Sequence, residues 1–470
     1  MAARIPSAAA APSGRAGRSG SLAVWSCFAL GLGLSLLLWA RSQVGGDQLN
    51  LLARGWLLAV RGVWISYGNP MSTGGKAPGG ITSLLVGWPL LLWRDHRAPT
   101  LVVVLCHVGA FLILDATLKR VLGARERALF AVLYWLNPWR LYFSGFLWNP
   151  NYLYLFGAIH LATTFHQRRR KSFWLSLLHV LSLGLALQIH ASSLLLLAAS
   201  ALLWLRGYWK LDRWGAAAGF LLANLPLLPW YRDVALHPAL LAEANKGFPG
   251  RGLLLLFPLV RGVLYWLRYS SLSLSGRMGI FDFKEALGAA ADRWLQPLFF
   301  FLSQIVAPAT IPIPLAANLW LARRNRLRLR SRFPAAAPDR AWLHGYVAWT
   351  FLALVLILAL SPTTFMYWQG LILLHVAVLP LVLWAGALRR TRLGGRVAAG
   401  LWTYAALEVV LVLGMAFGSP DYRCAGTETV VFPLRSHSPM FEDLHVQATC
   451  PWPLDQPGGW WPDVLPKAGE

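Results

Sequence analysis

The chain has 470 residues, of which 57% are hydrophobic and only 13% charged, against about 25% charged in a typical soluble protein. Its mean hydropathy of +0.50 and its 25 Trp residues exclude an ordinary soluble domain and indicate a membrane protein, because indoles favour the headgroup interface. The net charge of +24 does not indicate nucleic-acid binding, because most basic residues fall in short loops between apolar runs, the positive-inside pattern.

The N-terminal part of the chain predicts a tail followed by one membrane span. Residues 1–21 are rich in Ala, Ser and Gly and contain three arginines and no acid, which predicts a disordered cytoplasmic tail. The apolar residues 22–40 are long enough to cross a bilayer. If the tail is inside, the segment that follows, 41–98, is the first outer loop.

The first outer loop contains several distinct segments. Asp47 and Gln48 follow two glycines and precede an amphipathic run over 49–67, which predicts an interfacial helix with Arg54 and Arg61 on its polar side. A loop over 68–80 comes next. The last apolar run, 81–93, has 13 residues, too few to span a bilayer. We therefore interpret it as an interfacial or re-entrant helix.

Ten further apolar runs predict membrane spans. They fall near residues 99–118, 128–146, 152–166, 173–190, 193–206, 214–231, 294–321, 341–360, 368–388 and 397–417. With these boundaries every dense basic cluster lies on one side, at Lys119/Arg120/Arg125/Arg127, Arg168–Lys171, Arg206/Lys210/Arg213, 323–332 and Arg389/Arg390/Arg392/Arg396. The positive-inside rule thus predicts about eleven spans, a cytoplasmic N-terminus and an external C-terminus.

Two long outer segments complete the predicted organisation. Residues 231–293 form an outer loop with an interfacial helix that carries Arg261 and Arg268, and 294–418 hold the C-terminal membrane helices. The polar tail 419–470 contains Cys424 and Cys450, 26 residues apart. In an oxidising compartment we expect them to form a disulfide, which would stabilise a loop of this size by about 3 kcal/mol.

Acidic residues are scarce, with 19 in the whole chain, so Asp47 stands out as a candidate catalytic carboxylate. It lies just beyond the first span, near the positive N-terminus of the predicted helix. The same position also suits a helix cap, and the two roles are compatible.

Three other outer turns carry polar side chains. Asn149 and Asn151 flank a proline, a pattern that forms a tight turn with or without a function. Gln188 and His190 end the fifth predicted span, where they need polar partners, most simply a backbone carbonyl. The hydroxyl- and aromatic-rich turn at 361–369 is also typical of an aromatic belt. All of these fall on the outer face, where Arg261 and Arg268 suit an anionic ligand.

The order of these features resembles the GT-C superfamily of membrane glycosyltransferases, especially bacterial protein O-mannosyltransferases and lipid A aminoarabinose transferases. The resemblance covers roughly residues 22–230. It rests on Asp47, the amphipathic helix that follows it, Lys76-Ala77-Pro78 before a short apolar helix, the Trp148-Asn149-Pro150 turn and the stretch 187–192.

The resemblance implies an all-α, GT-C-like enzyme of the bacterial inner membrane with a periplasmic C-terminus. Such an enzyme transfers a sugar, with inversion, from a polyprenyl-phosphate carrier to a glycan, lipid or protein acceptor in the envelope. Asp47 would be the general base and Lys76 with the outer arginines would stabilise the departing phosphate.

The chain departs from the family pattern at two acidic positions. Gln48 follows Asp47 where many members have a second acid, and Asn149 and Asn151 occupy a turn where many have another. A divalent metal would want several carboxylate oxygens, so we expect transfer without a metal or other cofactor.

Two alternatives stay open at this point. A flippase or transporter for a lipid-linked sugar would show charged residues at mid-span and broken helices at matching places in two halves. An O-antigen ligase or polymerase would place its key arginines and His in a large late outer loop, for which 231–293 is a candidate.

Overall fold

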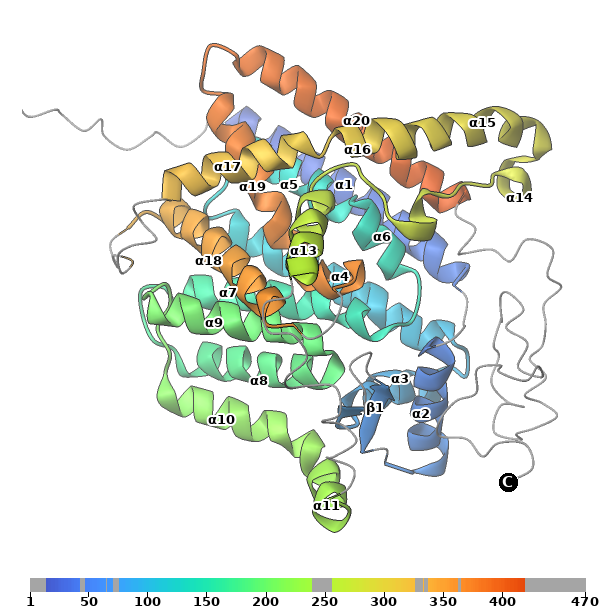
Figure 1. Ribbon diagram of the computed structural model, residues 1–470, viewed down its shortest axis with the longest axis vertical. Coiled ribbons are helices and arrows are strands. Elements are labelled where there is room, and N and C mark those ends of the chain that lie inside the picture. Colours follow the sequence, from blue (N-terminus) through green and yellow to red (C-terminus); the bar gives the residue numbers. More distant parts are fainter. Residues whose placement is uncertain are drawn as a thin grey trace, which may run out of the picture.

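The computed structural model describes residues 14–42, 47–64, 66–70, 76–238, 256–325, 333, 337–361 and 365–418. The predicted disulfide between Cys424 and Cys450 and the rest of the tail lie outside the described residues, as does the side chain of Lys76. The described chain is almost entirely helical (Figure 1).

Six helical segments are long and apolar enough to cross a membrane, so the chain is a multi-pass membrane protein. They are α1 (Gly14–Ala40, apolar from Gly20), α4 (Arg97–Leu118), the stretch Ala289–Asn325, α18 (Asp339–Ala359), the stretch Tyr367–Leu388 and α20 (Gly394–Gly418). The remaining predicted spans correspond to shorter or interrupted helices, and eleven spans stays a prediction. The short apolar run within the first outer loop, which we predicted not to span, forms α3 (Ile81–Leu92) and is not one of the six.

The first helix begins earlier than the sequence predicted. Residues from Gly14 belong to α1, so the predicted disordered tail is wrong from that residue onward. Adding a residue to an existing helix is far easier than starting one, and Arg and Ala are good helix formers. The apolar span therefore extends its helix back into the basic tail.

Interrupted helices replace two of the predicted spans. The span at 128–146 consists of α5 (Ala124–Phe130), a π-helical turn (Ala131–Trp135) and α6 (Pro138–Ser144). Asn137 caps α6 by accepting a hydrogen bond from the Trp139 N–H, and its amide donates to the Tyr269 carbonyl at 2.9 Å. The stretch Ala289–Asn325 contains α15 (Ala289–Phe301), a π-helical turn (Leu302–Val306), α16 (Ala307–Ala309) and α17 (Pro312–Asn325).

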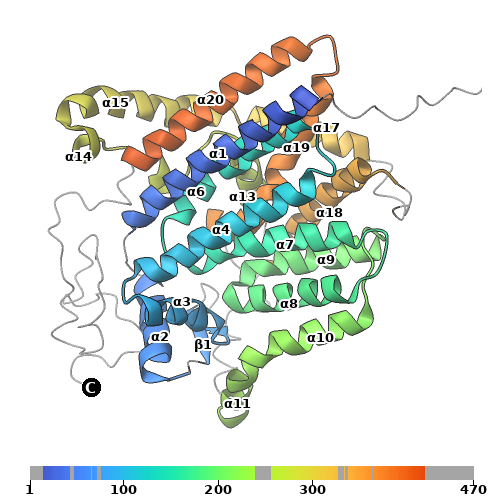
Figure 2. The same ribbon diagram turned by 180° about the vertical axis from the view of Figure 1, so that it is seen from behind.

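One end of the bundle, here called the basic end, gathers the loops with dense basic clusters. Ion pairs link these loops: Glu126 binds Arg340 at 2.7 Å, and Asp339 binds Arg168 at 2.8 Å. The helices α7 (Leu153–His166), α8 (Phe173–Ile189), α9 (Leu194–Leu205) and α10 (Arg213–Asn224) run side by side between this end and the opposite one (Figures 1 and 2).

The opposite end, here called the hairpin end, carries the first outer loop as a compact unit. It consists of α2 (Asp47–Arg61), an antiparallel pair of strands, β1 (Tyr67–Pro70) and β2 (Lys76–Pro78), and α3 (Figure 1). The sequence predicted a loop over 68–80, but the two strands pair there. Gly55 and Gly87 let α2 and α3 approach closely, because a Cβ at Gly87 would lie 2.6 Å from the Gly55 carbonyl oxygen.

The sequence predicted that Arg54 lies on the polar side of α2, but the structure places it elsewhere. It is only 1% exposed, and its guanidinium donates to Asn50 Oδ1 at 3.1 Å and to the Tyr67 carbonyl at 2.5 Å. The partly buried Tyr67 carbonyl of β1 takes its hydrogen bond from Arg54, and the amphipathic pattern of α2 could not reveal that the strand lies against this face.

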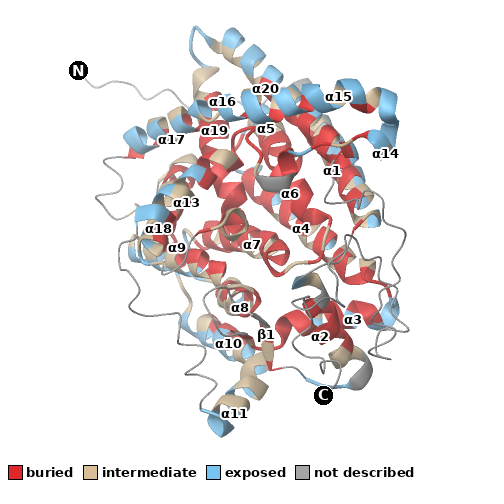
Figure 3. Ribbon diagram, turned by 45° about the vertical axis from the view of Figure 1, so that its right-hand side comes forward, coloured by how far each residue is buried: buried red, intermediate tan, exposed pale blue. Residues whose placement is uncertain are grey.

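The predicted interfacial helix forms α13 (Leu256–Tyr269), which packs against α18 and α19 (Leu374–Leu388). Its buried face includes Tyr265, Trp266 and Tyr269. The centre of the bundle is formed around α6, α7 and α19, whereas α10, α11 (Leu228–Leu236) and α15 lie at the periphery (Figure 3).

Candidate functional site

The predicted carboxylate, Asp47, is tied to a distant turn at the hairpin end. The Trp148 indole N–H donates to Asp47 Oδ2 over 3.0 Å. Asp47 is the first residue of α2 and is exposed, and Trp148 lies in extended backbone before the 3₁₀ turn η2 (Asn149–Tyr152). The bond fixes one carboxylate oxygen while the side chain stays accessible to solvent.

Trp148 also begins a continuous group of rings, here called the aromatic wall. Its members come from α6, the segment between α6 and η2, α13 and the 3₁₀ helix η8 (Tyr367–Leu373). They are Trp139, Phe143, Phe146, Trp148, Tyr265, Tyr367 and Trp368. The Trp148 ring centroid lies 6.0 Å from that of Phe143 and 5.1 Å from that of Trp368. Trp148, Tyr367 and Trp368 are half-buried, so the wall is partly open.

The far side of the wall carries two arginines from α13. The Arg268 guanidinium lies 5.8 Å from the Trp139 ring centroid and 5.6 Å from that of Tyr265, and it donates to Ser273 Oγ at 3.1 Å and to the Leu274 carbonyl. Arg261 donates to the Tyr265 hydroxyl at 3.3 Å. Tyr265 in turn contacts Tyr367, with ring centroids 6.0 Å apart. The wall thus joins a carboxylate at one side to guanidinium groups at the other.

The predicted asparagines hold the turn behind the wall. Asn151 is fully buried and donates to the Phe146 carbonyl at 2.8 Å, and Asn149 is 6% exposed and donates to the Ile189 carbonyl at 3.3 Å. Within the described residues, the side-chain oxygens of both amides lack a hydrogen-bond partner. The structure therefore brings both residues to the site while placing them beneath its surface.

Gln188 and His190 lie at the end of α8, next to the same turn. Gln188 is 2% exposed and donates to the Ala223 carbonyl of α10 at 2.7 Å. His190 Nδ1 accepts the Ser192 backbone N–H at 3.1 Å, which leaves Nε2 to carry the ring proton.

The hairpin that carries Lys76 also meets the end of α8. Gly79, with φ +87°, closes the turn after β2, and a Cβ there would lie 2.9 Å from Gln188 Oε1. Only glycine suits both this backbone conformation and the close approach. The backbone of Lys76 is therefore near the site, whereas Gln48 is half-buried beside Asp47.

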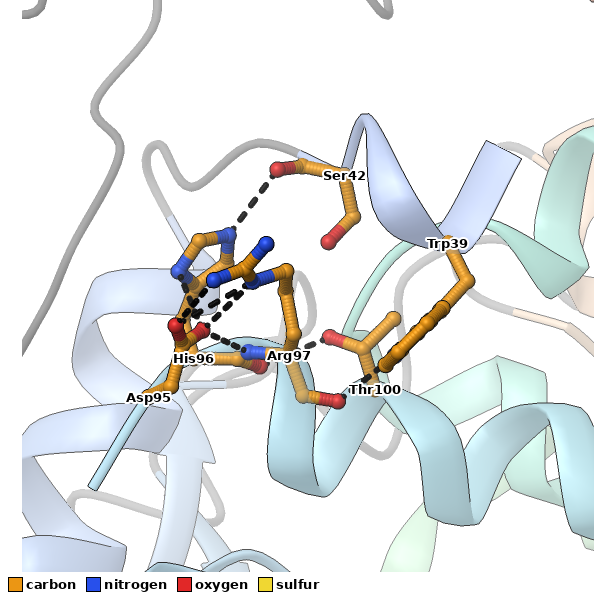
Figure 4. Close-up of polar contacts among 6 residues, drawn as sticks. All are labelled: Trp39, Ser42, Asp95, His96, Arg97 and Thr100. Atoms are coloured by element: carbon orange, nitrogen blue, oxygen red, sulfur yellow. Dashed lines mark hydrogen bonds and ion pairs between the residues drawn. The ribbon is translucent and has the colours of Figure 1, made fainter. Parts of the chain in front are cut away.

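A polar clasp that the sequence analysis did not single out lies beside this site (Figure 4). The Asp95 carboxylate accepts hydrogen bonds from two Arg97 guanidinium nitrogens, at 2.6 and 3.0 Å, and from the Arg97 backbone N–H at 2.8 Å. His96 Nε2 contacts the Ser42 carbonyl at 2.9 Å, and the Trp39 indole donates to the Arg97 carbonyl at 2.7 Å. These contacts fasten the end of α1 to the start of α4.

The electrostatics of this clasp favour a structural role. Burial by itself would raise the pKa of Asp95, but the hydrogen bonds from Arg97 and the nearby His96 hold it below its usual value. A carboxylate saturated in this way is a poor base. The clasp could have been suspected from the sequence, because the chain has few charges and Asp95, His96 and Arg97 are consecutive.

A fully buried arginine also escaped the sequence analysis. Arg140 in α6 is 0% exposed, donates to Ser35 Oγ of α1 at 2.9 Å and places its guanidinium 3.8 Å from the Trp135 ring centroid. An arginine inside a predicted span is uncommon, so the sequence alone could have marked Arg140 as a residue that needs polar partners. Arg140 fixes α6, and with it Trp139 and Phe143 of the wall, against α1.

Comparison of the chain with protein-family models, curated proteins and solved structures finds no match. Among the described residues, no group of three or more His, Cys, Asp or Glu side chains is placed to hold a metal ion.

Proposed function

We propose that the chain is a membrane glycosyltransferase that moves a sugar from a polyprenyl-phosphate donor to an envelope glycan, lipid or protein. The observation that supports this most directly is the Asp47–Trp148 hydrogen bond, which sets a carboxylate beside the aromatic wall while Arg268 lies at the wall's other side. In this proposal the hairpin end faces the outside of the membrane.

The site residues suit the two charges that develop in such a transfer. Asp47 would take the proton of the acceptor hydroxyl. The oxygen of that hydroxyl would attack the anomeric carbon of the sugar from the face opposite the phosphate. The bond from that carbon to the phosphate oxygen breaks with inversion, and the electron pair leaves with the lipid phosphate. Arg268 would stabilise this charge, since guanidinium binds phosphate through paired donors.

The remaining residues would position the reactants. The half-buried rings of Trp148 and Trp368 offer flat apolar faces to a sugar. The Trp148 N–H would orient Asp47, because its hydrogen bond limits the rotation of the carboxylate. We propose Gln48, Lys76, Asn149, Asn151, Gln188, His190 and Arg261 as substrate-binding or supporting residues.

The test is transfer of a labelled sugar from a polyprenyl-phosphate donor by the purified full chain. We expect Asp47→Asn to lower transfer by about 10²–10⁴-fold, the usual contribution of a general base. Asp233→Asn, which removes another acid from the outer segment after α10, is the matched control and should keep activity. Unchanged transfer by Asp47→Asn would refute the assignment, and lipid translocation without any transfer would favour a flippase.

Metal-independent transfer is a separate part of the proposal. It is supported by the amides that follow Asp47 in the chain and flank Pro150 in the η2 turn, namely Gln48, Asn149 and Asn151, where a divalent metal would want carboxylates. Amide oxygens alone bind divalent cations weakly. Activity should persist in EDTA, and its loss in EDTA with recovery in manganese or magnesium would contradict this part alone.

A further inference from the structure

A cavity at the basic end lies far from the proposed transfer site. It has a volume of about 440 Å³ and is lined mainly by residues of α1, α5, α19 and α20, which run close together (Figure 1). Seven of its fifteen lining residues are glycine or alanine, among them Ala23, Ala128, Ala398 and Ala405. Small side chains on all four helices leave this space open, and its volume is within the range of small-molecule sites, about 300–1,000 Å³.

The cavity is apolar inside and has arginines at its edge. Arg125 at the start of α5 and Arg389 at the end of α19 both line it. Arg125 is exposed and Arg389 half-buried. Glu126 also lines it, but both of its oxygens are bound by Arg340, at 2.7 and 2.9 Å. The net charge at the edge of the cavity is therefore positive.

The other acids at the basic end do not neutralise these two arginines. Asp115 is paired with Arg127 at 2.8 Å, Asp339 with Arg168 at 2.8 Å, and Asp212 caps α10 through the Trp214 and Gly215 N–H groups. Within the described chain, no carboxylate is paired with Arg125 or Arg389. Two cations are thus left at the edge of an apolar space.

The surroundings of the cavity indicate what occupies it. Both α1 and α20 are membrane-spanning by length and composition, and Trp402 at the cavity's edge is 70% exposed, as expected for an indole at the lipid interface. Basic pockets between membrane helices on this side of a bilayer bind anionic lipid headgroups. We propose that the cavity binds one acyl chain of an anionic phospholipid, whose phosphate is held by Arg125 and Arg389.

The proposal is tested by counting lipids retained on the purified full chain by native mass spectrometry, after exchange into mixed phosphatidylglycerol and phosphatidylcholine micelles. We expect retained phosphatidylglycerol on the native chain. The double substitution Arg125→Gln/Arg389→Gln should weaken retention by about tenfold or more. Ala398→Phe, which fills the cavity, should abolish it while leaving both arginines in place.

The matched control is Arg390→Gln/Arg392→Gln, which removes two exposed arginines next to the cavity that do not line it. This control should retain phosphatidylglycerol as the native chain does. Equal retention of phosphatidylcholine, undiminished binding by the Arg125/Arg389 variant, or equal loss in the control would each overturn the proposal. None of these outcomes depends on sugar transfer, so the result is independent of the proposed function.

Discussion

The Trp148 indole and the Asp47 carboxylate meet at 3.0 Å across 101 positions of sequence. The contact joins the helix of the first outer loop to the turn between α6 and α7, and it connects the carboxylate with the aromatic wall. Trp148 therefore contributes a hydrogen-bond donor to the site in addition to its ring.

Replacing Trp148 by Phe keeps a ring in the wall but removes the donor. We expect sugar transfer to fall by about 10- to 100-fold, corresponding to the loss of a hydrogen bond to a charged group, with little change in the melting temperature. Trp174→Phe, at an indole that is 73% exposed on α8, is the control and should transfer sugar normally. A Trp148→Phe variant with full activity would show that this bond does not orient the carboxylate.

Gly157 lets α7 approach η8, which carries Tyr367 and Trp368 of the wall. A Cβ at Gly157 would lie 2.3 Å from the Ile372 carbonyl oxygen, a backbone atom that cannot move without moving η8. We expect Gly157→Ala to destabilise the protein by about 1–3 kcal/mol, the usual cost of overpacking, and to lower transfer as well. Thermal melting in detergent measures the first effect.

The control for this prediction is Gly33→Ala in α1, where a Cβ would meet nothing within 4 Å. Alanine favours helix over glycine, so this variant should melt at the same temperature as the native chain or slightly higher. If Gly157→Ala behaved in the same way, the close contact between α7 and η8 would not contribute to stability.

The clasp formed by Asp95 and Arg97 predicts a dependence of stability on pH. The pKa of Asp95 is lowered in the folded protein, so the folded state favours the charged carboxylate. Its contribution is complete above the unfolded pKa of about 4 and is lost as the pH falls through the lower folded value. Asp95→Asn should therefore cost about 1–2 kcal/mol near neutral pH, a modest value because Arg97 is about one-third exposed.

The measurement for Asp95 is the difference in melting temperature between the native chain and Asp95→Asn across pH. The difference should shrink as the solution is acidified below about pH 4, because the native carboxyl then becomes neutral as well. A constant difference throughout the acid range would mean that the ion pair adds nothing to stability.

Arg140 and Ser35 should be energetically coupled. Ser35→Ala leaves the buried guanidinium without its 2.9 Å partner, which should cost about 1–3 kcal/mol. In an Arg140→Met background the same change should be nearly neutral, because no charge remains to be satisfied. Melting of the two single variants and the double variant gives the coupling, and additive effects would contradict it.

The sequence predicted the features that depend on local composition. Long apolar runs identified the six segments that are long enough to span a membrane, and the short run at 81–93 forms α3, which is not among them. It did not predict that Arg54 is buried, because the strand that covers this face of α2 is set by tertiary contacts. An amphipathic pattern reports which side of a helix is polar and does not report what lies against it.

The candidate site was only partly predictable for a similar reason. Asp47 was identified by the scarcity of acids, and Asn149 and His190 by their place in outer turns. The contact of Asp47 with Trp148, and that of Trp148 with Trp368, join residues far apart in the chain. The sequence singled out the turns that contain Trp148, Tyr367 and Trp368, but it did not predict that their rings meet each other or the rings of α6 and α13.

The distribution of the aromatic wall along the chain has a consequence for biogenesis. Asp47, Trp148 and the α6 rings are synthesised early, whereas Tyr367 and Trp368 belong to η8, which follows α18. During translation the carboxylate is therefore delivered to the membrane long before the wall beside it is complete. A truncated chain that stops before η8 would contain most of the helices and still lack Tyr367 and Trp368 of the wall, so the site is complete only when nearly all of the described chain has been made.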